Sequence, residues 1–205
     1  LGYGAGDDLR LHRDSPMWLP LTLDEYLRET GDFDLLRLRI PFRDKGSGTV
    51  WEHVLQGLQR LYSERGAHGL CKIGAGDWND SLNEVAIEGR GQTAWLTIAT
   101  VYAMRVTRRI AGAIGDTRTV KLLTRRIAEL DRVANRVAWD GDWYIYAIDD
   151  HDRTIGSRRD KEGRIHLNSQ TWAIFAGISR GERLNRVLRT IDQRLGTKFG
   201  PILMH

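Results

Sequence analysis

The residues best suited to chemistry lie in a short segment at 76–80, which reads Gly-Asp-Trp-Asn-Asp and follows two more glycines at 69 and 74. Glycine allows backbone conformations that are closed to other residues and lets the chain approach a ligand closely. Asp77 and Asp80 flank an indole, so a group able to transfer a proton lies beside a flat apolar face. This mixture in a loop between helices predicts a site of chemistry.

The same residues have a structural interpretation. Asp77 and Asp80 can cap the segment that follows them and accept bonds from its backbone, and Trp78 can anchor the core. A second glycine-rich loop, Glu88-Gly-Arg-Gly91, follows before a long apolar stretch begins.

Apolar periodicity and helix-stop signals predict that helices position these loops. The expected helices span 18–30, 49–65 after a Thr-Val-Trp-Glu capping box, 92–114, 117–138, 168–179 and 182–195. The helix at 92–114 is apolar on nearly every side, as buried helices are, whereas 117–138 has one apolar stripe. Aromatic and β-branched residues between turn formers predict a short hairpin near 139–150. The expected fold is all-α, with one small β excursion.

Composition limits the classes of function. The 205 residues suit a single domain, and the net charge of +4 comes from arginines dispersed among acidic residues, which disfavours nucleic acid as a partner. One cysteine allows no internal disulfide, and no apolar run approaches the roughly 18 residues of a membrane span. Six histidines without metal-ligand spacing predict no metal site. We expect a cytoplasmic protein without membrane contact or cofactor.

The segments 68–83 and 88–95 resemble the signature of the cellobiose/chitobiose phosphorylases, a glycoside phosphorylase family. That family includes 1,2-β-oligoglucan phosphorylases and the phosphorylase-like domains of cyclic β-1,2-glucan synthases. Collinear matches run through the chain at Asp14-x-x-x-Trp18-Leu-Pro20, Trp139-Asp-Gly-x-Trp-Tyr144 and Ser169-Gln-x-Trp172. The resemblance implies part of an (α/α)6 barrel with its site in loops at one end. Family members are several times longer, so residues 1–205 are expected to be one domain that is a fragment of a larger catalytic barrel.

The implied chemistry is reversible phosphorolysis of a β-linked gluco-disaccharide or oligosaccharide to a sugar 1-phosphate. Inverting cleavage needs a carboxylic acid that protonates the leaving oxygen and a nucleophile on the opposite face of the sugar. Inorganic phosphate, as co-substrate, is that nucleophile, and cationic or hydrogen-bonding groups must hold it. By match to the motif, Asp80 is the general acid, with a pKa raised for that task.

The resemblance also suggests binding residues. Asp77 binds a sugar hydroxyl or orders its loop, and Trp78 presents its face to the sugar. Further sugar contacts are expected at Asp14, Arg13, Asp142, Tyr146, Gln170 and Trp172. Arg158, after Gly156-Ser157, is the candidate for phosphate by resemblance, and Arg90 is a candidate by composition. The structural alternatives are a helix cap for Asp14, core packing for Trp172 and a solvated loop for Arg158.

Two other functions remain open at this point. An inverting hydrolase on the same barrel would need a second carboxylate opposite Asp80, for which Glu84, Glu88 and Asp142 are candidates. A non-catalytic fragment would bind carbohydrate or only a partner chain. The expected partner is the rest of a larger chain or a second copy in a homo-oligomer.

Overall fold

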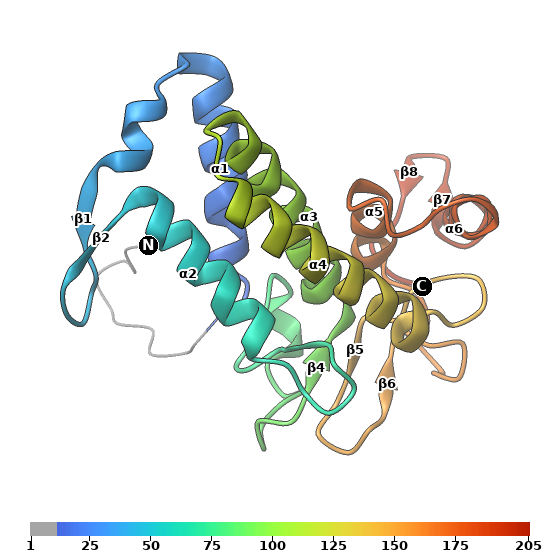
Figure 1. Ribbon diagram of the computed structural model, residues 1–205. Coiled ribbons are helices and arrows are strands. Elements are labelled where there is room, and N and C mark those ends of the chain that lie inside the picture. Colours follow the sequence, from blue (N-terminus) through green and yellow to red (C-terminus); the bar gives the residue numbers. More distant parts are fainter. Residues whose placement is uncertain (1–11) are drawn as a thin grey trace.

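The computed structural model describes residues 12–205, with every side chain in that range except that of Asp80. This part of the chain is mostly helical, as predicted (Figure 1). Its α-helices are α1 (Ser15–Thr30), α2 (Val50–Ser63), α3 (Ala94–Ala113), α4 (Thr117–Val133), α5 (Leu167–Phe175) and α6 (Glu182–Thr190). The short helices are η1 (Phe33–Arg37) and η2 (Asp80–Leu82), and the π-helical segments η3 (Ala134–Ala138) and η4 (Ile191–Leu195) extend α4 and α6.

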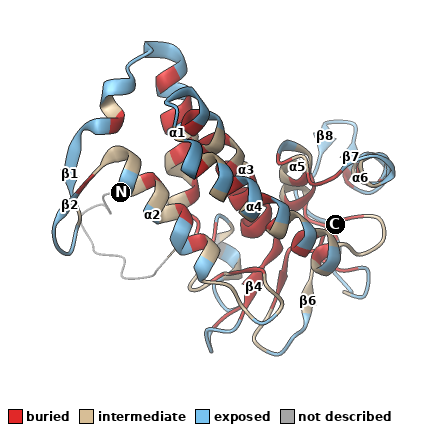
Figure 2. Cartoon of the chain, viewed as in Figure 1, coloured by how far each residue is buried: buried red, intermediate tan, exposed pale blue. Residues whose placement is uncertain are grey.

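Helix α3 is the centre of the fold. It contacts α1, α2, α4 and α5, and its residues are buried over most of its length (Figure 2). Helix α4 instead buries one stripe, including Leu123, Ile127 and Leu130. The inner and outer characters predicted for these two helices are therefore confirmed. Within residues 12–205, no helix has the length and apolarity needed to cross a membrane.

Local sequence signals set the ends of the helices. Helix α1 begins at Ser15, earlier than predicted, because Pro16 fits the first helical turn, and it ends at Gly31, whose φ of 67° is left-handed. The predicted capping box at the start of α2 is present: the Thr49 hydroxyl accepts from the Glu52 backbone N–H, and the Glu52 carboxylate accepts from that of Thr49.

The prediction of a single β excursion is incomplete. A four-stranded antiparallel sheet joins β3 (Cys71–Lys72), β4 (Gln92–Thr93), β5 (Ala147–Ile148) and β6 (Thr154–Ile155) in that order. Two further hairpins pair β1 (Arg39–Pro41) with β2 (Ser47–Thr49), and β7 (Gly196–Thr197) with β8 (Gly200–Pro201). Strands of two or three residues are too short for alternation to be recognised in the sequence.

The four-stranded sheet connects the loops to the central helix. Strand β4 runs directly into α3, and Thr93 is both the last residue of the strand and the N-cap of the helix. The sheet therefore lies at the N-terminal end of α3 and brings the loops around residues 76, 90 and 150 together.

The capping box gives a test of the fold. We expect Thr49→Ala to lower the free energy of unfolding by about 1 kcal/mol in urea denaturation, because the first turn of α2 loses a side-chain acceptor. Thr49→Ser keeps the hydroxyl and should stay near the wild type. Equal stability of the two variants would contradict a capping contribution here.

Candidate active site

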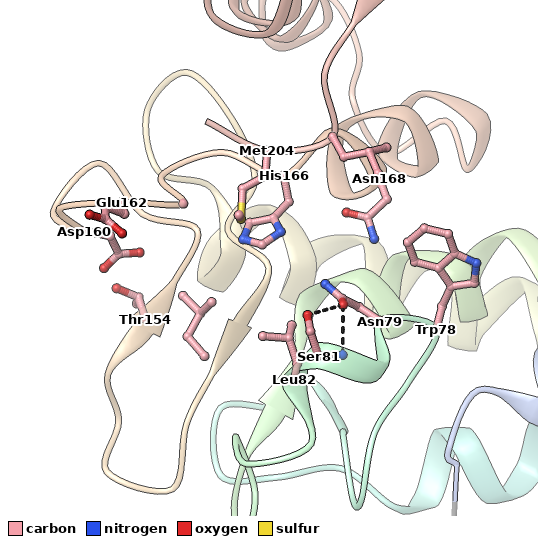
Figure 3. Close-up of a pocket in the computed structure, with 13 residues that line it drawn as sticks. Trp78, Asn79, Ser81, Leu82, Thr154, Asp160, Glu162, His166, Asn168 and Met204 are labelled. Carbon is pink, nitrogen blue, oxygen red and sulfur yellow. Dashed lines mark hydrogen bonds between the residues drawn. The ribbon is translucent and has the colours of Figure 1, made fainter.

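A cavity of about 790 Å³ opens beside the Gly-Asp-Trp-Asn-Asp loop (Figure 3). This cavity, here called the site cavity, is lined by the loop 78–82, strand β6, the loop 160–163, the start of α5 and residues 203–204. Trp78 lies at one end and is half exposed, while Asp160 and Glu162 lie at the other end. Among residues 12–205, no lysine or arginine lines it.

The loop is anchored by the buried carboxylate of Asp77. One of its oxygens accepts from the Asn79 backbone N–H (3.0 Å) and the Tyr146 hydroxyl (2.7 Å), and the other accepts from the Thr93 hydroxyl (2.8 Å). Burial raises the pKa of Asp77, these three donors act to lower it, and the nearby Asp14 carboxylate raises it further. Asp77 thus links its own loop to β4 and to Tyr146, the residue before β5. These contacts correspond to the second of the two roles expected for Asp77, that of ordering its loop.

Asp80 begins η2, and its side chain lies outside the part of the structure that is described. The residues on either side of Asp80 are joined by hydrogen bonds. The Asn79 side chain accepts from the backbone N–H (3.2 Å) and the hydroxyl (2.6 Å) of Ser81. The general-acid assignment of Asp80 stays a prediction.

An aromatic cluster supports Trp78 from behind. Its ring centroid lies 6.3 Å from that of Trp95, which is fully buried and also packs against Trp18 (6.4 Å) and Trp172 (5.8 Å). Because Trp18, Trp95 and Trp172 belong to α1, α3 and α5, three helices meet under the indole. Trp172 has its described ring contacts within this cluster and with Tyr102 and Phe175.

Asp14 occupies the N-cap position of α1, but its side chain makes no capping bond. One carboxylate oxygen accepts from the Trp18 indole N–H at 2.8 Å instead. Arg13, beside it, forms an ion pair with Glu64 and lines a different, smaller hollow. The structure therefore places Asp14 near Asp77 and directs Arg13 to another part of the surface.

Tyr146 and Gln170 are both fully buried. The Tyr146 hydroxyl donates a hydrogen bond to the Asp77 carboxylate. Burial, and then the charge of Asp77, raises the pKa of Tyr146 strongly. Gln170 brackets the backbone of Tyr144, accepting from its N–H (2.8 Å) and donating to its carbonyl (2.7 Å). The side chain of Gln170 also donates to the His166 carbonyl at 3.0 Å. Sugar contacts by these two residues stay predictions.

The two candidate phosphate ligands do not line the site cavity. Arg158 pairs with Asp140 (3.3 Å) and Asp142 (4.0 Å) and lies over the Trp143 ring. Arg90 pairs with Glu88 (2.5 Å) and donates to the Asp150 carbonyl, beside a separate hollow of about 810 Å³. Asp142, predicted as an acceptor contact, is paired outside the cavity with Arg158 and with Arg186 (3.6 Å).

Sequence reasoning missed several lining residues, namely Thr154, Asp160, Glu162 and Asn168. They share no motif and come from three places, namely strand β6, the loop 160–163 and the first turn of α5. His166 also lines the cavity, and its ring lies 4.9 Å from that of Tyr146. Burial lowers the pKa of His166, so the imidazole is neutral at pH 7. Thr93 could have been noticed as the hydroxyl directly before the apolar helix.

Comparison with known proteins identifies the family. The model of the catalytic domain of the glycosyl hydrolase 94 superfamily matches residues 4–205. The chain therefore belongs to this superfamily, and the resemblance recognised in its motifs is confirmed. A solved GH78 family rhamnosidase of Bacillus sp. GL1 has the same fold, with a TM-score of 0.67 over 90% of this chain and 18% of that one, at 22% identity.

Among curated proteins, the chain is similar to two phosphorylases of Paenibacillus borealis. It is 38% identical over 198 residues to a solabiose phosphorylase, covering 96% of this chain and 26% of that protein. It is 41% identical over 194 residues to a 3-O-beta-D-glucopyranosyl-beta-D-glucuronide phosphorylase, covering 94% and 25%. The chain thus spans about a quarter of the length of these relatives.

The anchor at Asp77 can be tested through Tyr146. We expect Tyr146→Phe to lower the free energy of unfolding by about 1–2 kcal/mol, because a buried carboxylate loses a donor. The folded state already holds the Asp77 proton to a higher pH than the unfolded chain does, so stability falls as pH rises between the two pKa values. Removing a donor raises the pKa of Asp77 in the folded state further. The loss in free energy of unfolding of Tyr146→Phe, relative to the wild type, should therefore grow above about pH 4.

Tyr26→Phe is the matched control, because the Tyr26 hydroxyl donates to Asp32 at 3.0 Å on the exposed surface. Its effect should stay within about 0.5 kcal/mol and change little with pH. Urea denaturation between pH 4 and pH 8 measures both variants. A Tyr146→Phe deficit that is constant across this range would contradict the coupling to Asp77.

Proposed function

We propose that this chain is part of an inverting glycoside phosphorylase that reversibly cleaves a β-linked gluco-disaccharide or oligosaccharide to a sugar 1-phosphate. The observation that carries the proposal is the family match across residues 4–205, which includes the Gly-Asp-Trp-Asn-Asp loop at the site cavity. Several similar curated proteins are phosphorylases, including a cellobionic acid phosphorylase and N,N'-diacetylchitobiose phosphorylases.

We infer that residues 1–205 form a single-domain fragment of an (α/α)6 barrel. The pairing of a helix buried on every side, α3, with an outer helix, α4, supports this interpretation. In such a barrel the loops at the N-terminal end of α3 would form part of one rim. The remainder of a longer chain, or a second copy, would complete the structure.

In the proposed reaction, one sugar ring lies against the exposed face of Trp78. Asp80 gives its proton to the glycosidic oxygen as the bond between that oxygen and the anomeric carbon breaks. A phosphate oxygen forms the new bond to the anomeric carbon from the opposite face, which inverts a β-linkage to an α-sugar 1-phosphate. Asp77 orders the backbone of the loop, so the Asp80 carboxyl group is not needed for that task and can donate its proton.

Phosphate needs a binding site with cations or several hydrogen-bond donors. We keep Arg158 and Arg90 as proposed ligands, which would have to leave their present carboxylate partners, Asp140 and Glu88. Other phosphate ligands would come from segments of a longer protein that lie outside residues 1–205.

An inverting hydrolase is the second candidate, because two carboxylates, Asp160 and Glu162, line the same cavity as the loop that carries Asp80. A base on the opposite face of the sugar would activate water in place of phosphate. Of the candidates named from the sequence, Glu88 and Asp142 are engaged in ion pairs. Glu84, the third of these candidates, does not line the cavity, so the loop 160–163 is the better source of such a base.

Phosphate dependence separates the two activities. We expect cellobiose or sophorose to yield a sugar 1-phosphate only when phosphate is added, as measured by product chromatography. The assay uses the 205-residue chain and an extended chain that also includes the residues encoded by the flanking sequence. Glucose release without phosphate would favour the hydrolase, and the absence of both reactions in the extended chain would exclude either enzyme.

The acid is tested by Asp80→Asn, which cannot donate the required proton. We expect turnover to fall by about 10²–10⁴-fold, while sugar affinity measured by calorimetry is retained. Asp34→Asn on the exposed helix η1 makes the same chemical change at a distance and should leave turnover unchanged. Retained activity in Asp80→Asn would show that the assignment is wrong.

A further inference from the structure

Among the side chains that the structure describes, one pair carries the charge of the site cavity. Asp160 and Glu162 are carboxylates, His166 is buried and neutral, and no lysine or arginine of residues 12–205 contributes to the lining. The other polar lining groups of the described chain are amides and hydroxyls, such as Asn79 and Asn168. The described side chains of the lining therefore carry two negative charges and no positive one.

Within residues 12–205, neither carboxylate of this pair forms an ion pair. One Asp160 oxygen accepts from the Ser157 backbone N–H at 2.8 Å, which orders the loop but adds no positive charge. Arg164 donates to the backbone carbonyl of Asp160 (2.7 Å), and not to its carboxylate. Glu162 is exposed and forms no ion pair within the described residues.

The position of the pair gives it a role. Asp160 and Glu162 lie across the cavity from Trp78 (Figure 3). If one sugar ring stacks on Trp78, as in the proposed function, the next ring extends toward these carboxylates. A carboxylate accepts hydrogen bonds from sugar hydroxyls and repels another carboxylate at short range. Such repulsion is a usual means of excluding a wrong ligand.

We propose that Asp160 and Glu162 form a selectivity site that admits an uncharged sugar and excludes sugar acids at the second ring. This inference rests on the proposed function, because it assumes that the cavity holds a sugar chain with one ring on Trp78. Glu162 contributes mainly through its charge, and Asp160 contributes charge while also holding its loop.

The test compares two disaccharides: a β-linked glucosyl-glucose and the same compound with glucuronic acid as the second residue. Affinity for the protein is measured by calorimetry, and Trp78→Ala, which should weaken both ligands, reports that binding is in the cavity. We expect the acidic ligand to bind the wild type at least about fivefold more weakly at low salt. The difference should shrink at about 0.5 M salt, because the charges are partly exposed.

Glu162→Gln should narrow the preference by raising the affinity for the acidic ligand, and Glu162→Lys should reverse it. Glu25→Gln, on the exposed face of α1, removes the same charge far from the cavity and should leave the preference unchanged. Asp160→Asn tests the second carboxylate, with unfolding measured in parallel because of its bond to Ser157.

Each outcome decides the matter. Equal affinity of the wild type for both ligands, or a preference that Glu162→Gln leaves unchanged, would overturn the inference while leaving the proposed phosphorylase intact. If Trp78→Ala leaves the affinity for both sugars unchanged, or if the wild type binds neither sugar, the site cavity does not bind sugar. Either result would overturn the inference. Selective binding without phosphate-dependent turnover would support the selectivity site and count against the phosphorylase alone.

Discussion

The architecture of the site depends on one buried carboxylate. A charge removed from water is unfavourable unless hydrogen bonds replace the lost solvation. Asp77 obtains its donors from three places: its own loop, Thr93 at the start of α3, and Tyr146 before β5. Satisfying this carboxylate therefore requires the three segments to meet at one point. The exposed position of Trp78 and the start of η2 follow from that constraint.

Apolar packing complements this polar anchor. The cluster of Trp18, Trp95 and Trp172 joins α1, α3 and α5 directly beneath Trp78. Edge-on contacts between large rings fix relative orientation as well as separation. Bonds from the carboxylate and contacts from the rings thus hold the same loop from two directions. A rigid loop suits a site that must keep its reacting groups in a constant geometry.

The sequence predicted what depends on local pattern. The helices, the capping box at Thr49 and the inner character of α3 were all visible, because periodicity and caps act over a few residues. The four-stranded sheet was not, since its two-residue strands are defined by partners far along the chain. For the same reason the partners of Arg158, the bond from Trp18 to Asp14 and the carboxylates of the loop 160–163 could only be found in three dimensions. The motif indicated which loop holds the site, but not which neighbouring loops line it.

The short sheet also has a consequence for the order in which the molecule is built. Strand β3 ends at Lys72, while β5 and β6 end at Ile148 and Ile155, so the loop that carries Asp77 and Trp78 has no complete support until the later strands exist. Bringing such distant segments together costs chain entropy before any contact rewards it. During synthesis on the ribosome, α1, α2 and α3 can begin to pack first, and the loop acquires its geometry only after the hairpin of β5 and β6 has emerged. Within residues 12–205, the loop on which catalysis is proposed to depend is therefore among the last segments to become native.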